Sequence, residues 1–135
     1  MNLTISRAHA GLALVAMAAI VLQFFLAGIG IFGAASIQAH RITGYLITLA
    51  AVLLLVFALI GQLGRPRIMF SAILLVLLVV QIALIESNQP WIEALHSLNA
   101  LAILGVTAQL AMRGRDARRS GTVVDSPTVR AAQGE

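Results

Sequence analysis

Residues 68–85 read IMFSAILLVLLVVQIALI, an apolar run without a single charged side chain. A helix needs about 20 apolar residues to cross the hydrocarbon core of a bilayer. Three further charge-free runs occur, at residues 10–32, 42–64 and 94–112. Because lipid offers the backbone no hydrogen-bond partners, each run is predicted to be a membrane-spanning helix.

The composition agrees with a bilayer as the solvent. Of the 135 residues, 60% are apolar and only 10% are charged, which is more apolar surface than a soluble domain of this size can bury. The net charge of +4 comes from short arginine patches between uncharged runs, a pattern that is typical of membrane loops and argues against nucleic-acid binding. Cysteine is absent, which excludes disulfides, thiolate metal sites and covalently attached haem.

Short polar connections separate the four runs, so consecutive spans are predicted to be antiparallel neighbours. Ser36 is expected to cap the second span, and Pro90 fits the first turn of the fourth. The sequence therefore predicts an all-α, transmembrane, up-down-up-down four-helix bundle over residues 1–112, with spans at about 9–32, 37–62, 67–86 and 90–112. Residues 113–135 are polar and rich in small residues, and a disordered cytoplasmic tail is expected there.

The arginines also predict an orientation. If both termini are cytoplasmic, eight of the nine basic residues lie inside and only Arg41 lies outside, which satisfies the positive-inside rule. We therefore expect a multi-pass protein of the bacterial inner membrane, either alone, as a homodimer or within a larger membrane complex. A cleaved signal peptide is the alternative for the first span, but its apolar run is longer than such a segment requires.

The two halves of the chain resemble each other. VLQFFL at 21–26 is followed by HRITG at 40–44, and VVQIAL at 79–84 is followed by HSLNA at 96–100. Each half thus has a glutamine in its first span and a histidine early in its second span. His40 and His96 are expected at similar depths, roughly 6–9 Å from the outer helix ends. Since their spans are diagonal in an up-down bundle, the two imidazoles are predicted to face each other across its axis.

Ionisable side chains inside membrane spans are costly, so a pair of them indicates a functional site. Two imidazoles are too few for a closed zinc site, but they suffice as the axial ligands of a b-type haem. Gly44, one turn beyond His40, is expected to leave room for a flat ring. In the plain alternative, each histidine packs at a helix interface and hydrogen-bonds a neighbour.

Other polar residues are predicted to support this haem site. A metal-bound histidine usually donates its second N–H to an acceptor, and Gln23, Gln81, Thr43 and Asn99 are the candidate acceptors. Arg41 is expected to pair with a haem propionate at the membrane interface.

His9 lies near the cytoplasmic end of the first span, with no second histidine at its depth. It is expected to be an interfacial residue without a role in the site. The inner half of the bundle is expected to be dry.

The motif QFFLAG at 23–28 followed by HRITG at 40–44 resembles one four-helix half of haem A synthase. That family has an H-R-x-x-G motif on the second helix of a half and another histidine on the fourth, and these residues ligate haem. The resemblance covers about residues 10–112 and implies that His40 and His96 hold a haem. The synthase has two such halves where this chain has one, and its glutamate three residues before the histidine is replaced here by Ile37. The chain also resembles the small four-span proteins of high-GC bacteria.

These observations predict a membrane protein that binds one haem b near the outer face, for electron transfer, haem handling or redox sensing. The alternative is a cofactor-free accessory or scaffold subunit whose polar residues hold helices together. A third interpretation is a small transporter that uses Gln23, Gln81 and the histidine pair. No nucleophile or acid–base pair is recognisable in the sequence, so no enzymatic activity is predicted.

Overall fold

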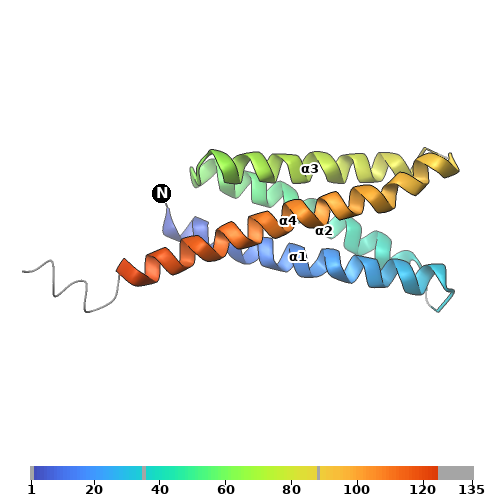
Figure 1. Cartoon of the computed structure of the whole chain (residues 1–135), viewed down its shortest axis with the longest axis horizontal. Coiled ribbons are helices and arrows are strands. Elements are labelled where there is room, and N and C mark those ends of the chain that lie inside the picture. The colour runs from blue at the N-terminus through green and yellow to red at the C-terminus, as the bar shows by residue number, and fades with distance from the viewer. Residues whose placement is uncertain (1, 35, 88, 125–135) are drawn as a thin grey trace, which may run out of the picture.

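The computed structural model describes residues 2–34, 36–87 and 89–124, with side chains as far as Gly114. Within these residues the chain forms α1 (Leu3–Ile31), α2 (Gln38–Ile60), α3 (Arg65–Ile85) and α4 (Pro90–Val124), and no strands (Figure 1). The predicted all-α fold is confirmed.

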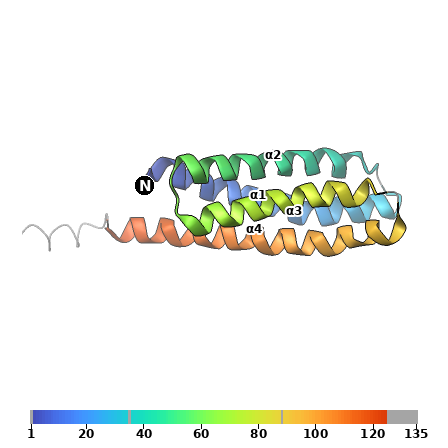
Figure 2. The ribbon, with the colours of Figure 1, turned by 90° about the horizontal axis from the view of Figure 1, so that it is seen from above.

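The helices form an elongated bundle in which each helix runs antiparallel to the next (Figures 1 and 2). Helix α1 packs against α2 and α4, and α3 packs against the same two helices. The backbones of α1 and α3 do not approach each other, and neither do those of α2 and α4. The predicted up-down-up-down topology is therefore confirmed, with α2 and α4 on one diagonal. We call the end that carries the N-terminus and the α2–α3 connection the N-terminal end, and the other the far end.

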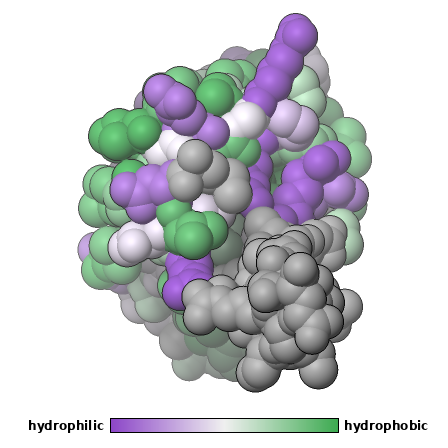
Figure 3. All heavy atoms as spheres, turned by 90° about the vertical axis from the view of Figure 1, so that its left-hand side faces the viewer, coloured by the Kyte–Doolittle hydropathy of each residue, from purple (hydrophilic) through white to green (hydrophobic). Residues whose placement is uncertain are grey.

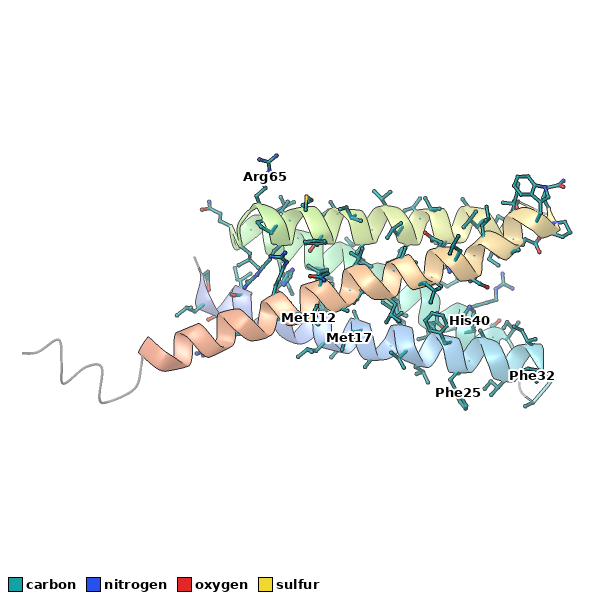
Figure 4. All side chains as sticks on the ribbon, viewed as in Figure 1. Met17, Phe25, Phe32, His40, Arg65 and Met112 are labelled. Atoms are coloured by element: carbon teal, nitrogen blue, oxygen red, sulfur yellow. The ribbon has the colours of Figure 1, made fainter. Side chains whose placement is uncertain are left out.

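All four helices are long and apolar enough to cross a membrane. Large apolar side chains also cover the outside of the bundle. For example, Phe25 of α1 and Phe32 at its C-cap point away from the other helices (Figure 4) and are 63% and 88% exposed. Such a surface is stable in lipid and unstable in water. The chain is thus built as a multi-pass membrane protein.

The helix ends differ from the predicted limits for local reasons. Helix α1 begins at Leu3 because the Asn2 side chain accepts hydrogen bonds from the backbone N–H groups of Thr4 and Ile5, as an N-cap does. Helix α2 has Ile37 at its N-cap position, and Ser36 contributes by accepting a bond from Gln38 N. Helix α4 begins at Pro90, as predicted, but continues past 112 to Val124. The first part of the predicted tail is therefore helical, and 125–135 lie outside the described residues.

Small and branched apolar residues fill the middle of the bundle. Helix α1 contributes Ala13, Ala16 and Ile20, and Leu54 and Leu74 are fully buried on the facing helices α2 and α3. Small side chains let helices approach closely, which is how membrane helices associate. This apolar core separates two polar regions, one near each end of the bundle.

The polar region at the N-terminal end corrects the prediction of a dry inner half. His9 was expected at the interface, but its side chain is 0% exposed, and its Nε2 lies 3.3 Å from Ser71 Oγ. Arg67, at the start of the predicted third span, lies within α3 and is buried. Hydropathy scores each residue by its own polarity. It therefore does not predict that a polar side chain such as His9 or Arg67 is buried against a polar neighbour.

Candidate functional site

His40 and His96 lie together near the far end of the bundle. His40 is in the first turn of α2 and His96 is in the second turn of α4; Figure 4 shows His40 in the half of the bundle away from the N-terminus. The two ring centroids are 6.3 Å apart, with an angle of 55° between the ring planes. Both side chains are half-buried. The pair expected from the sequence repeat is therefore in place, and it bridges two diagonal helices whose backbones do not meet.

Each histidine is fixed by two reciprocal hydrogen bonds to the glutamine of its own half. In the first half, Gln23 Nε2 donates to His40 O at 3.0 Å, and His40 Nδ1 lies 3.2 Å from Gln23 O. In the second half, Gln81 Nε2 donates to His96 O at 3.1 Å, and His96 Nδ1 lies 3.3 Å from Gln81 O. The sequence repeat is thus also a repeat of geometry. The predicted glutamines do contact the histidines, but the acceptor is the backbone carbonyl and not the side-chain oxygen.

These bonds determine the tautomer of both rings. A carbonyl oxygen can only accept, so Nδ1 of each histidine must carry the proton that is donated to it. In the neutral imidazole Nε2 then has a free lone pair, which is the form that binds metals. Neither Nε2 has a hydrogen-bond partner among the described residues. The site therefore presents two oriented nitrogen ligands on opposite helices.

The two halves differ in how they hold the glutamine. Asn99 Nδ2 donates to both Gln81 Oε1 and Leu77 O, so the Gln81 side chain is held from two sides. The equivalent residue of the first half is Thr43, whose hydroxyl donates to Ala39 O of its own helix. Consequently Gln23 Oε1 is buried without a partner among the described residues. Asn99 and Thr43 were predicted as acceptors for the histidines, and neither has that contact.

This difference predicts that Thr43→Asn stabilises the protein. The new amide lies at the position that Asn99 occupies in the other half, so it is expected to donate to Gln23 Oε1. A hydrogen bond of this kind between membrane helices contributes about 0.6–1.5 kcal/mol. The free energy of unfolding in detergent micelles should rise by that amount. Thr48→Asn is the matched control, because Thr48 makes the same kind of bond within α2, to Gly44 O, and lies more than one turn further along the helix than Thr43. An equal change in both variants would contradict the prediction.

Gly44 has a different role from the one expected. A Cβ atom there would lie 3.0 Å from Gln23 Nε2, so the missing side chain lets the Gln23 amide reach His40 O. The glycine thus makes room for the supporting glutamine rather than for a ring. The Arg41 side chain is exposed next to the site and makes no hydrogen bond or ion pair with a described residue.

Within the described residues, no group of three or more histidine, cysteine, aspartate or glutamate side chains is placed to hold a metal ion. The two imidazoles would consequently bind a metal only if the rest of its coordination came from elsewhere. A porphyrin supplies such ligands itself.

Comparison with protein families matches residues 23–88 to a family of unknown function, DUF6220. The match begins at Gln23 and includes His40 and Gln81, but it ends before His96. Neither the curated proteins nor the solved structures give a significant match to the chain.

Proposed function

We propose that this membrane protein binds one b-type haem between α2 and α4, where His40 and His96 would hold its iron. The observation that carries the proposal is the close pair of imidazoles, in which each Nδ1 donates to a carbonyl and each Nε2 has no hydrogen-bond partner among the described residues. The Nε2 lone pairs of His40 and His96 would hold the iron of such a haem. The two ring centroids are only 6.3 Å apart, so both imidazoles lie beside the same space.

The residues around the two histidines would hold them in position for the haem. Gln23 and Gln81 lock each histidine backbone to the preceding helix, and Asn99 fixes Gln81 in turn. A hydrogen bond from Nδ1–H to an acceptor also raises the basicity of a metal-binding imidazole. Arg41 would supply a positive charge beside the site for a propionate. When bound, haem supplies one-electron redox chemistry, which suits electron transfer, haem handling or redox sensing.

We also propose the orientation that the arginines favour, with both termini in the cytoplasm of a bacterial cell. The N-terminal end of the bundle carries Arg7, Arg65, Arg67 and Arg113, and the far end carries Arg41 with Glu86 and Glu93. This arrangement would place the histidine pair in the outer leaflet.

Titration of the purified protein with haemin tests the proposal directly. We expect saturation at one haem per chain, a sharp Soret band and the absorption of a low-spin, six-coordinate iron in both oxidation states. Empty micelles at the same detergent concentration are the control for haemin that dissolves in the apolar phase. A spectrum identical to that of the micelles would favour the alternative function, a cofactor-free accessory subunit. The reciprocal glutamine–histidine bonds support that alternative, because they join α1 to α2 and α3 to α4 without any ligand.

A further inference from the structure

Four buried polar side chains form a second cluster at the N-terminal end, which we call the Arg67 cluster: Ser6, His9, Arg67 and Ser71. Arg67 Nη1 donates to Ser6 Oγ at 2.8 Å, and His9 Nε2 lies 3.3 Å from Ser71 Oγ. Both contacts join α1 to α3, the diagonal pair whose backbones do not approach each other. The side chains therefore reach across the axis of the bundle, as the histidine pair does on the other diagonal.

The charge of Arg67 is not balanced within the described side chains. Arg67 is 8% exposed, and its guanidinium contacts a hydroxyl and the backbone carbonyl of Arg113, which lies 3.4 Å from Nη2. The acidic side chains among the described residues are Glu86 and Glu93, which belong to the far end of the bundle. A buried cation is costly unless an anion accompanies it. Arginine also offers five N–H donors, and the described contacts use only two of the nitrogens.

His9 adds to the cluster a second polar group without a hydrogen-bond partner among the described residues. Its side chain is 0% exposed, and Nδ1 has no hydrogen-bond partner among the described residues. When the Ser71 hydroxyl donates to Nε2, the ring proton lies on Nδ1, which is then a buried donor without an acceptor. A buried polar atom without a partner is rare in native proteins and costs free energy. The Arg67 guanidinium thus has unused donors and a positive charge without an acidic partner among the described side chains, and an anion that accepts hydrogen bonds would satisfy both; in the tautomer with the proton on Nδ1, His9 would add a donor to the same ligand.

We propose that the Arg67 cluster binds a phosphate-type oxyanion, which comes either from the headgroup of an anionic lipid or from free phosphate. The planar guanidinium of arginine matches two oxygens of such an anion. The cluster also lies where a phosphate is available, because hydrophilic side chains gather on this end of the molecule (Figure 3), as they do at the headgroup level of a membrane protein. Arg7, Arg65 and Arg113 add positive charge to the same end, which attracts anions. This inference does not depend on haem binding at the far end.

Thermal unfolding of the apo protein distinguishes the two sources. In one arm, the protein is held in an uncharged detergent and titrated with sodium phosphate, with sodium chloride of equal ionic strength as the reference. In the other arm, it is held in nanodiscs of phosphatidylcholine with or without phosphatidylglycerol. A ligand that binds only the folded state raises the unfolding midpoint. A rise in the first arm identifies free phosphate, and a rise in the second alone identifies the lipid headgroup. The absence of a rise in both arms would overturn the proposal.

Two arginine variants distinguish a specific anion site at Arg67 from non-specific attraction of anions to the arginine-rich end of the bundle. Arg67→Gln removes the buried charge and should weaken the apparent affinity for the effective phosphate source about ten- to a hundredfold. Arg65→Gln removes an equal charge two residues away, from a side chain that is exposed and points out from α3 (Figure 4), so its affinity should change less than about twofold. Equal losses in both variants would contradict a specific site. If Arg67→Gln does not fold, native mass spectrometry of the wild-type protein gives the answer, because a bound phospholipid or phosphate should survive delipidation in stoichiometric amount.

Discussion

His40→Ala and His96→Ala are each expected to abolish the low-spin haem spectrum of the reconstituted protein. Either change leaves one imidazole at the site, so a retained iron would become high-spin. The apparent affinity for haemin should fall by more than about a hundredfold, since even residues that only support a metal ligand contribute 10–100-fold. Absorption spectra and electron paramagnetic resonance of the three proteins, at equal haemin and protein concentrations, measure both effects.

Two further variants make the comparison specific. His9→Ala removes an imidazole that is fully buried in the Arg67 cluster at the other end of the bundle; it should lower stability but leave the spectrum unchanged. Asn99→Ala removes the bond that holds Gln81, the residue that accepts from His96 Nδ1, and should weaken haemin binding about tenfold without loss of the low-spin form. An unchanged spectrum in His96→Ala would mean that the second ligand is not His96. The pairing of the two halves would then be structural only.

The sequence was sufficient to predict the four spans, their order and the meeting of His40 with His96. The span prediction succeeded because a helix in lipid must be both long and apolar, so length and charge alone reveal it. The meeting of the histidines followed from the repeat, because equal depth on alternate helices of an up-down bundle places two residues on one diagonal. The distance of 6.3 Å between the two ring centroids depends on how the helices pack, and it could not be predicted from the sequence.

The details of the hydrogen bonding were not predictable in the same way. Gln23 and Gln81 were expected to accept through their side chains, but their backbone carbonyls accept and their amides donate. A sequence does not reveal which carbonyl of a helix is turned toward a neighbouring side chain. The difference between Asn99 and Thr43, which leaves Gln23 Oε1 without a partner, likewise appears only in three dimensions.

The Arg67 cluster was missed for a more general reason. In a soluble helix the polar residues face outward, so a pattern of polarity shows which face is buried. In these helices the outward face is also apolar, and the pattern carries little information about the core. Ser6 and His9 are three residues apart, and Arg67 and Ser71 are four apart, spacings that place each pair on one helix face. This spacing was the only hint of the cluster in the sequence. It shows that the two residues of each pair share a helix face, but it does not show that this face points into the bundle.

The second large effect is expected at Gly114, where α4 packs closely against α1. A Cβ atom at this position would lie 2.7 Å from Ala10 Cβ and 3.0 Å from Ala10 Cα. The backbone of α1 cannot give way as a flexible side chain does, so Gly114→Leu should push the two helices apart. Overpacking of this kind costs about 1–3 kcal/mol, and the free energy of unfolding in micelles should fall by an amount near the upper limit.

Gly28→Leu is the matched control, because Gly28 likewise lies within a helix, α1, and its Cβ would meet no atom within 4 Å. This variant should be as stable as the wild type or slightly more stable, since glycine is a poor helix former. The milder change Gly114→Ala should be partly rescued by Ala10→Gly, which removes the nearer of the two contacts. Displacement of α4 would also take the Arg113 carbonyl away from Arg67 Nη2, so Gly114→Leu should weaken anion binding while the histidine pair at the far end stays intact. Loss of haemin binding in this variant would contradict the independence of the two polar regions, because the apolar core between them would then be transmitting the change.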